Sequence, residues 1–181
     1  MINTQTARLF ARYKAWADEL LFTSIAQLPA AEVKATRQTL FKSILGTLNH
    51  NFVVDLIWKA NLQGEPHGFS RRDEILHPDL NDLFQAQQRE NQWFEGWAAK
   101  QTGASLAEVI PFKYVSGQEF AMSRGAMLMH LVNHASYHRG WVCEMFFEIP
   151  AKPPVTDLPV FLESHPAFDG PPDVDGHHAK A

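Results

Sequence analysis

Four long segments of this chain carry apolar residues at helical spacing, and glycine or proline follows most of them. They cover about residues 3–28, 40–62, 79–100 and 123–147. Apolar positions that recur every three or four residues form one face of an α-helix, and that face must be buried against another element. Four such helices with polar connections predict an all-α fold, a four-helix bundle.

The connections between these helices differ in character. A short helical turn is expected at 32–36, and glycine and proline make residues 64–78 a loop. Valine, isoleucine, phenylalanine and tyrosine around the sequence SGQ at 116–118 predict two short strands or an extended segment before the last helix.

The C-terminal region is rich in proline, which excludes a long helix there. The sequence DLPVFL at 157–162 is apolar enough to pack on the bundle. Glycine, proline and aspartate dominate the last residues of the chain, a composition typical of disorder. We therefore expect a bundle domain over residues 1–162 and a disordered Pro/Gly/Asp-rich tail over residues 163–181.

The composition narrows the class of protein. Hydrophobic residues are 45% and charged residues 20% of 181, enough for one domain to bury a core without disulfides. A net charge of -4 gives no electrostatic reason to bind nucleic acid, and the basic pair Arg71 and Arg72 is followed at once by Asp73 and Glu74. Cys143 is the single cysteine, and we expect it to be a buried small residue. Without a signal sequence or a long apolar run, the expected location is the cytoplasm, with no membrane partner.

Three histidines, His130, His134 and His138, follow one another at steps of four in the last helix. Residues four apart are separated by about 6 Å along a helix axis, so two neighbouring imidazoles reach one ion at about 2.0–2.1 Å. The outer two are about 12 Å apart, so one ion takes either His130 with His134 or His134 with His138. Part-buried histidines that bond neighbouring groups have the same spacing, so a metal site needs a further ligand.

His50 is the candidate for that ligand. It lies near the middle of the second long helix, and Val53, Val54 and Ile57 share its face, so its ring points towards apolar partners. An inward histidine needs a hydrogen bond or a metal to offset the loss of water. Residues near the middle of facing helices meet at one level of a bundle, which brings His50 towards His134.

Other polar residues are weaker candidates. His67, in the loop, stays open as an outer ligand. Asp18 and Asp55 are candidate carboxylate ligands or hydrogen-bond acceptors, although a solvated or paired charge is the more ordinary role. Arg124 and Arg139 are candidates to orient an anionic substrate, with a surface ion pair as the more ordinary role.

The segments LMHLVNHASYHRGWV (128–142) and TLNHNFVVDLIW (47–58) resemble the signature of the DinB family of metal-dependent bundle proteins. Further similar stretches extend the resemblance over about residues 5–162. One departure is Trp141, which stands where the family often has glutamine after HRG.

The resemblance implies a four-helix bundle, often a homodimer, with a divalent ion bound by His50, His134 and His138. His130 would then be a packing or hydrogen-bonding residue one turn away. Nickel and zinc are ions that suit three imidazoles.

Three protein ligands leave coordination positions free for chemistry. Some relatives within the family are thiol-dependent S-transferases, so the resemblance implies a metal-dependent transferase whose small-molecule substrate is a low-molecular-weight thiol. A metal-dependent hydrolase, or a non-enzymatic stress-response bundle with a structural ion, is the alternative. A fourth protein ligand, such as Asp55 or His67, would favour the structural ion.

Overall fold

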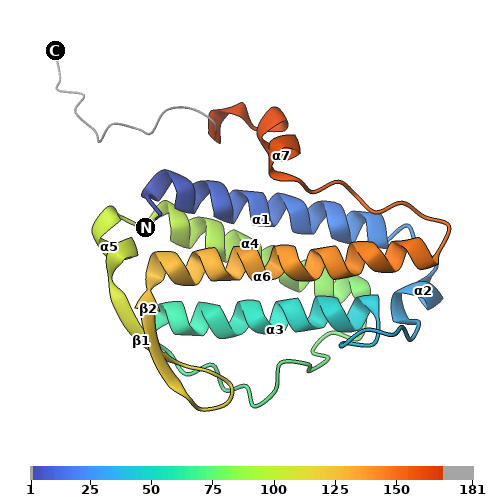
Figure 1. Ribbon diagram of the computed structural model, residues 1–181, viewed down its shortest axis with the longest axis horizontal. Coiled ribbons are helices and arrows are strands. Elements are labelled where there is room, and N and C mark those ends of the chain that lie inside the picture. The colour runs from blue at the N-terminus through green and yellow to red at the C-terminus, as the bar shows by residue number, and fades with distance from the viewer. Residues whose placement is uncertain (1, 169–181) are drawn as a thin grey trace.

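Four long helices run side by side in the computed structural model, which describes residues 2–168 (Figure 1). They are α1 (Thr4–Ile25), α3 (Ile44–Gln63), α4 (Leu80–Ala99) and α6 (Arg124–Met145). Helix α1 packs against α4 and α6, and α3 packs against the same two helices from the other side. The all-α four-helix bundle expected from the periodicity is confirmed. Over the described part of the chain, none of the helices combines the length and hydropathy needed to cross a bilayer.

Shorter elements close the two ends of the bundle. Helix α2 (Ala30–Lys34) and the 3-10 turn η1 (Phe146–Glu148) lie at one end. At the other end, α5 (Gly103–Ala107) leads into an antiparallel hairpin of β1 (Val109–Lys113) and β2 (Glu119–Ser123). The two short strands expected around SGQ are confirmed, whereas α5 was not predicted.

The second long helix begins later than expected. It starts at Ile44, because the Ser43 side chain accepts a hydrogen bond from the Gly46 N–H at 2.9 Å and caps the helix there. The preceding turn holds Lys42 at a φ of 67° and leaves Leu40 70% exposed. The start expected at residue 40 is therefore wrong, and Phe41 belongs to the turn.

The C-terminal segment packs on α1, as its apolar sequence predicted. Helix α7 (Leu158–Ser164) buries Phe161 completely, with its ring 5.8 Å from that of Tyr13 and 5.4 Å from that of Trp16. The 3-10 turn η2 (Pro166–Phe168) comes next. Helix α7 thus continues past the domain boundary expected at residue 162, and residues 169–181 of the expected tail lie outside the described residues.

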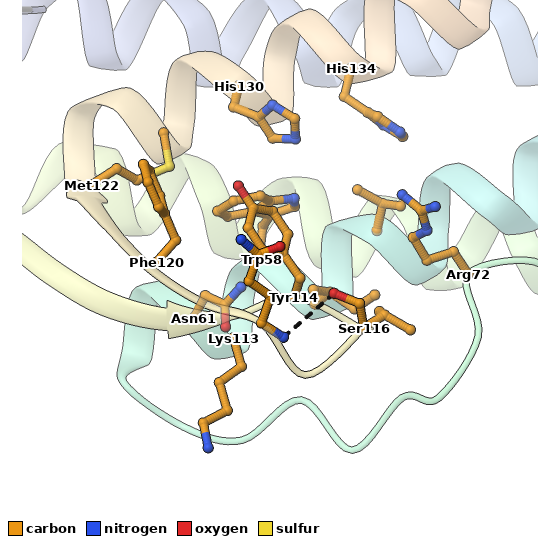
Figure 2. Close-up of a pocket in the computed structure, with 14 residues that line it drawn as sticks. Trp58, Asn61, Arg72, Lys113, Tyr114, Ser116, Phe120, Met122, His130 and His134 are labelled. Carbon is orange, nitrogen blue, oxygen red and sulfur yellow. Dashed lines mark hydrogen bonds between the residues drawn. The ribbon is translucent and has the colours of Figure 1, made fainter.

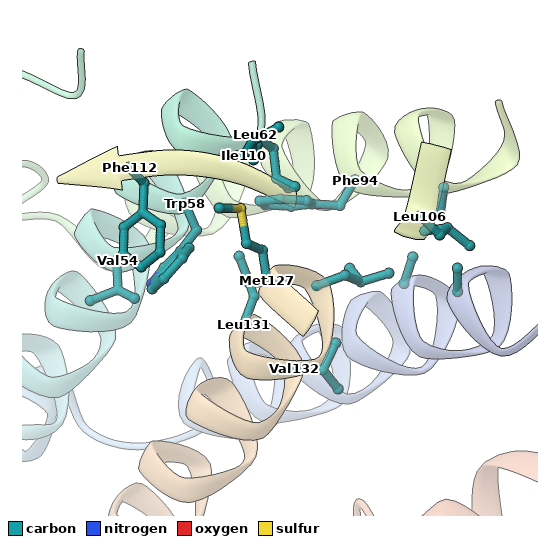
Figure 3. Close-up of a cluster of buried hydrophobic side chains, with 14 residues drawn as sticks. Val54, Trp58, Leu62, Phe94, Leu106, Ile110, Phe112, Met127, Leu131 and Val132 are labelled. Carbon is teal, nitrogen blue, oxygen red and sulfur yellow. The ribbon is translucent and has the colours of Figure 1, made fainter. Parts of the chain in front are cut away.

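Two apolar clusters fill the bundle, one towards each end. The first lies beneath the hairpin and includes Trp58, Phe94, Phe112 and Met127 (Figure 3). The second lies towards α2 and η1. Its members are Leu21, Phe22, Ile25, Val33, Ile44, Leu45, Leu48, Phe52, Leu83, Ala86, Val142, Met145 and Phe146.

A buried polar layer separates the two clusters, with Lys14 of α1 at its centre. The Lys14 ammonium donates to Asp18 at 2.9 Å, to Asp55 at 2.6 Å and to Asn91 at 2.9 Å, so all three of its hydrogens are used. Burial alone would lower the pKa of Lys14, but the two carboxylates outweigh it and the pKa is raised. Arg139 of α6 completes the layer by donating to Asp18 at 3.3 Å.

Replacing Lys14 by methionine should lower the free energy of unfolding by about 3–5 kcal/mol, because Asp55 would stay buried without its cation and Asp18 would keep only Arg139. Urea denaturation measures the change. The matched control is Arg12→Met on the same helix, where the guanidinium pairs with Glu95 at 3.1 Å while both side chains are substantially exposed. That control should cost less than about 1 kcal/mol. Equal losses in the two variants would contradict a structural role for the layer.

Replacing Gly46 by alanine should also destabilise the fold, because the new Cβ would overlap the carbonyl oxygen of Phe41. We expect a loss of about 1–3 kcal/mol, the usual cost of overpacking. Gly96→Ala is the control, since a Cβ there meets no atom within 4 Å and alanine favours the helix. It should raise the urea midpoint, and a rise for Gly46→Ala as well would show that the turn is not constrained.

Candidate metal centre

Helices α3 and α6 bring three histidine rings together near the middle of the bundle. His50 lies on α3, and His134 and His138 lie on α6 one turn apart. Each ring offers one nitrogen such that the three atoms all lie within 4.8 Å of one another. The Nε2 atoms of His50 and His134 are 3.2 Å apart. The grouping matches the set that the resemblance implied.

His130 does not belong to this group. Its ring lies 4.6 Å from that of Trp58 and 5.9 Å from that of His134, centroid to centroid. Of the two pairs that the spacing left open, the structure therefore gathers His134 with His138 around His50. His130 packs one turn away.

The orientation of the His50 ring is fixed by the loop between α3 and α4. Its Nδ1 lies 2.7 Å from the carbonyl oxygen of Arg72. A carbonyl only accepts, so Nδ1 carries the proton and Nε2 keeps a lone pair directed at His134. Phe41 covers the other side, with its ring stacked on His50 at 3.9 Å and 14°. This arrangement matches that of metal-binding histidines, which donate their second nitrogen to a carbonyl or carboxylate.

The donor set fits a first-row divalent ion. Two nitrogens about 2.0–2.1 Å from one ion, at tetrahedral or octahedral angles, are separated by about 2.9–3.4 Å. The 3.2 Å between His50 and His134 falls in that range. In addition, Nδ1 of His138 is buried without a hydrogen-bond partner, which is costly for an imidazole that nothing else satisfies.

Burial keeps the three rings neutral, and neutral imidazole is the form that binds metals. Desolvation lowers the pKa of His134 to about 2, and repulsion from His138 and His50 acts in the same direction. Desolvation, with repulsion from His50, lowers the pKa of His138 to about 4. Burial also lowers the pKa of His50, although the bond to the Arg72 carbonyl opposes the shift.

A pocket of about 650 Å³ opens beside His134 (Figure 2). Helix α3 supplies Trp58 and Ile57, the hairpin supplies Phe120 and Met122, and the inter-helix loop supplies Arg72. This volume lies within the usual range of small-molecule sites, about 300–1,000 Å³. His134, the member of the histidine group that lines this cavity, is therefore reachable through mainly apolar walls.

The carboxylates considered as ligands do not join the group. Asp18 and Asp55 bind Lys14 in the polar layer. His67 accepts a hydrogen bond from the Phe69 N–H at 3.0 Å and lies outside the group. Across residues 2–168, only His50, His134 and His138 form such a set, and no fourth histidine, cysteine, aspartate or glutamate joins it.

The two arginines considered for substrate binding have structural roles. Arg139 is 2% exposed and bonds Asp18 and Ser136, so a surface ion pair was the wrong expectation. Arg124 pairs with Glu108 at 2.9 Å and donates to the carbonyl oxygen of Leu62. Neither lines the pocket beside His134.

Cys143 packs at the edge of the second apolar cluster. Burial raises the pKa of its thiol, although Arg139 opposes the shift, and the thiol stays protonated at neutral pH. Cys143 is thus the small packing residue expected, although it is partly buried rather than buried.

Sequence reasoning missed two residues at the site. The apolar periodicity predicts Phe41 within a helix, whereas it stacks on His50 from the turn before α3. Arg72 was treated as part of a neutralised run, whereas its carbonyl holds His50 and its side chain lines the pocket. The one signal in the sequence is that Arg72 lies in the loop directly after the helix that carries His50.

Below about pH 6.5 the metal-free protein should lose stability. The unfolded chain protonates His134 near its ordinary pKa of 6.5, whereas the folded chain does so only near pH 2. Stability from this group is therefore complete above pH 6.5 and falls as the pH falls. Between pH 6.5 and 5.5, wild type should lose about 1 kcal/mol more than His134→Gln, measured by urea unfolding in a chelator. Parallel curves for the two proteins would contradict the neutral, buried state of His134.

The comparisons with known proteins agree with this geometry. The DinB family model matches residues 1–173. Protein DinB of Bacillus subtilis (strain 168) is 23% identical over 159 residues, which cover 83% of this chain and 90% of that protein. With a bundle fold and a three-histidine group that could hold a metal ion, the chain belongs to the DinB family.

Proposed function

We propose that this protein is a metal-dependent enzyme that binds a divalent cation, nickel or zinc, through His50, His134 and His138. The observation that carries the proposal is the convergence of three neutral imidazoles beside an open pocket. A structural zinc site has four protein ligands, whereas a catalytic one has three and leaves room for a substrate. The three-residue group fits the second kind.

A bound cation would supply Lewis acidity, which lowers the pKa of a coordinated thiol or water. The protein's own residues do the positioning. The carbonyl of Arg72 and the ring of Phe41 hold His50 in place. The apolar pocket walls, including Trp58 and Phe120, offer a surface for the body of a substrate.

The reaction we propose is transfer of a low-molecular-weight thiol to an electrophile. A sulfur–carbon bond forms, the leaving group departs, and the thiol proton passes to solvent. Three neutral ligands leave the full charge of the cation uncompensated, which favours binding of an anionic thiolate. The single cysteine of the chain, Cys143, does not line the pocket, so the thiol would have to be a small molecule.

Metal analysis of the purified protein is the first test. Wild type should carry about one nickel or zinc ion per chain, and His134→Ala should lose it because two imidazoles bind too weakly. His130→Ala is the matched control, since His130 lies one turn away on the same helix and outside the group. It should keep the ion. Equal metal content in wild type and His134→Ala would end the proposal.

A turnover screen then separates the functions. Metal-loaded protein with thiols and electrophiles should give a rate that metal-free protein and His134→Ala lack. A metal-dependent rate without thiol would indicate a hydrolase instead. If the protein binds about one ion per chain but shows no turnover with any thiol or electrophile, the ion would instead serve to stabilise the bundle.

A further inference from the structure

Two adjacent arginines in the loop between α3 and α4 have different surroundings. Arg71 forms a two-point ion pair with Asp73, at 3.0 Å and 2.9 Å. The guanidinium of Arg72 has no ion pair or hydrogen bond to any residue from 2 to 168, and it lines the pocket beside His134. Figure 2 shows the Arg72 side chain extending from the loop towards His134. Both arginines are exposed, but only Arg71 is neutralised by an ion pair, and Arg72 brings an unpaired positive charge to the edge of the pocket.

No carboxylate in the described chain lines this pocket to balance that charge. The other cationic residue on its wall is Lys113, whose ammonium pairs with Glu119 at 2.9 Å, where both side chains are exposed. In Figure 2 the Lys113 side chain points away from Arg72 and His134. Although the whole chain carries a net charge of -4, the local charge here is positive and centred on Arg72. Such a pocket favours an anionic ligand.

The backbone of Arg72 is held in place by a hydrogen bond with His50. Its backbone carbonyl accepts from Nδ1 of His50 at 2.7 Å, so the residue cannot move away without releasing that ring. The remaining wall is largely apolar, with Val54, Ile57, Trp58, Phe120 and Met122. A ligand that fits this wall has an apolar body and carries its charge at the end near Arg72.

We propose that the pocket binds small molecules with an aromatic or alkyl body and one carboxylate, which Arg72 holds. A guanidinium presents a planar pair of N–H groups that matches a carboxylate in two-point geometry. This assignment names the substrate class of the proposed enzyme. That such molecules also react there rests on the proposed function. The carboxylate contact itself requires only Arg72, and no cation.

The test compares two probes of the same shape, 3-phenylpropanoate and its neutral analogue 3-phenylpropanamide. Dissociation constants are measured by NMR, with the indole N–H resonance of Trp58 as the reporter in the pocket. Wild type should bind the carboxylate about two- to fivefold more tightly than the amide, as expected for an ion pair with a solvent-exposed arginine. In chelator-treated protein, Arg72→Gln should bind both probes equally, because the substitution removes the charge and keeps the backbone carbonyl.

Arg71→Gln is the matched control, with the same chemical change one residue away, and it should keep the preference of wild type. The measurements are made on zinc-loaded and on chelator-treated protein. A preference that persists without metal and disappears in Arg72→Gln supports the assignment even if the cation proposal fails. Three results in chelator-treated protein would each overturn the assignment. They are equal binding of the two probes by wild type, a preference retained in Arg72→Gln, and no detectable binding of the carboxylate by wild type.

Discussion

The buried ammonium of Lys14 is the interaction on which the packing of the four helices depends. It binds side chains from α1, α3 and α4, and α6 reaches the same layer through Arg139. All three donors of the buried ammonium are satisfied, and such a set of bonds is met in one alignment of the helices. Leucine and phenylalanine in the two flanking clusters tolerate small shifts, whereas this layer does not.

That alignment decides whether the histidines meet. His50 lies five residues before Asp55 on α3, and His138 directly precedes Arg139 on α6. The polar layer and the histidine group therefore occupy neighbouring levels of the same two helices. A slip of one helical turn between α3 and α6 would move their side chains by about 5 Å, beyond the reach of one ion. The charged layer thus sets the register that the site requires.

The fold and the three-histidine group were accessible from the sequence for different reasons. Periodicity located α1, α3, α4 and α6, because each has an apolar face to bury. The i, i+4 spacing indicated a histidine pair, but choosing His138 over His130 required the family resemblance. The sequence pattern does not say how far a helix is rotated in the bundle, and that rotation decides which histidine faces His50.

Other features of the site could not be predicted, because they depend on contacts distant in the sequence. Sixteen of the twenty residues of α3 are buried, since the loop and hairpin cover the side that the bundle leaves open. A surface position is expected for Arg139, because charged side chains are usually solvated. In the structure it is buried in a polar layer to which α1, α3 and α4 contribute Asp18, Asp55 and Asn91. Arg72 lies in a loop without periodicity, so no pattern indicated the direction of its side chain.

The segment between α3 and α4 contains no regular helix or strand from Gly64 to Asp79, yet it is anchored to α3 at two points. Arg72 receives the hydrogen bond of His50, and His77 exchanges backbone hydrogen bonds with the side chain of Asn49. Whatever immobilises the His50 ring consequently also immobilises this segment, and by thermodynamic reciprocity the converse holds. Insertions or substitutions between residues 64 and 79 would therefore change the orientation and mobility of the His50 ring, although this segment contributes none of the three histidines.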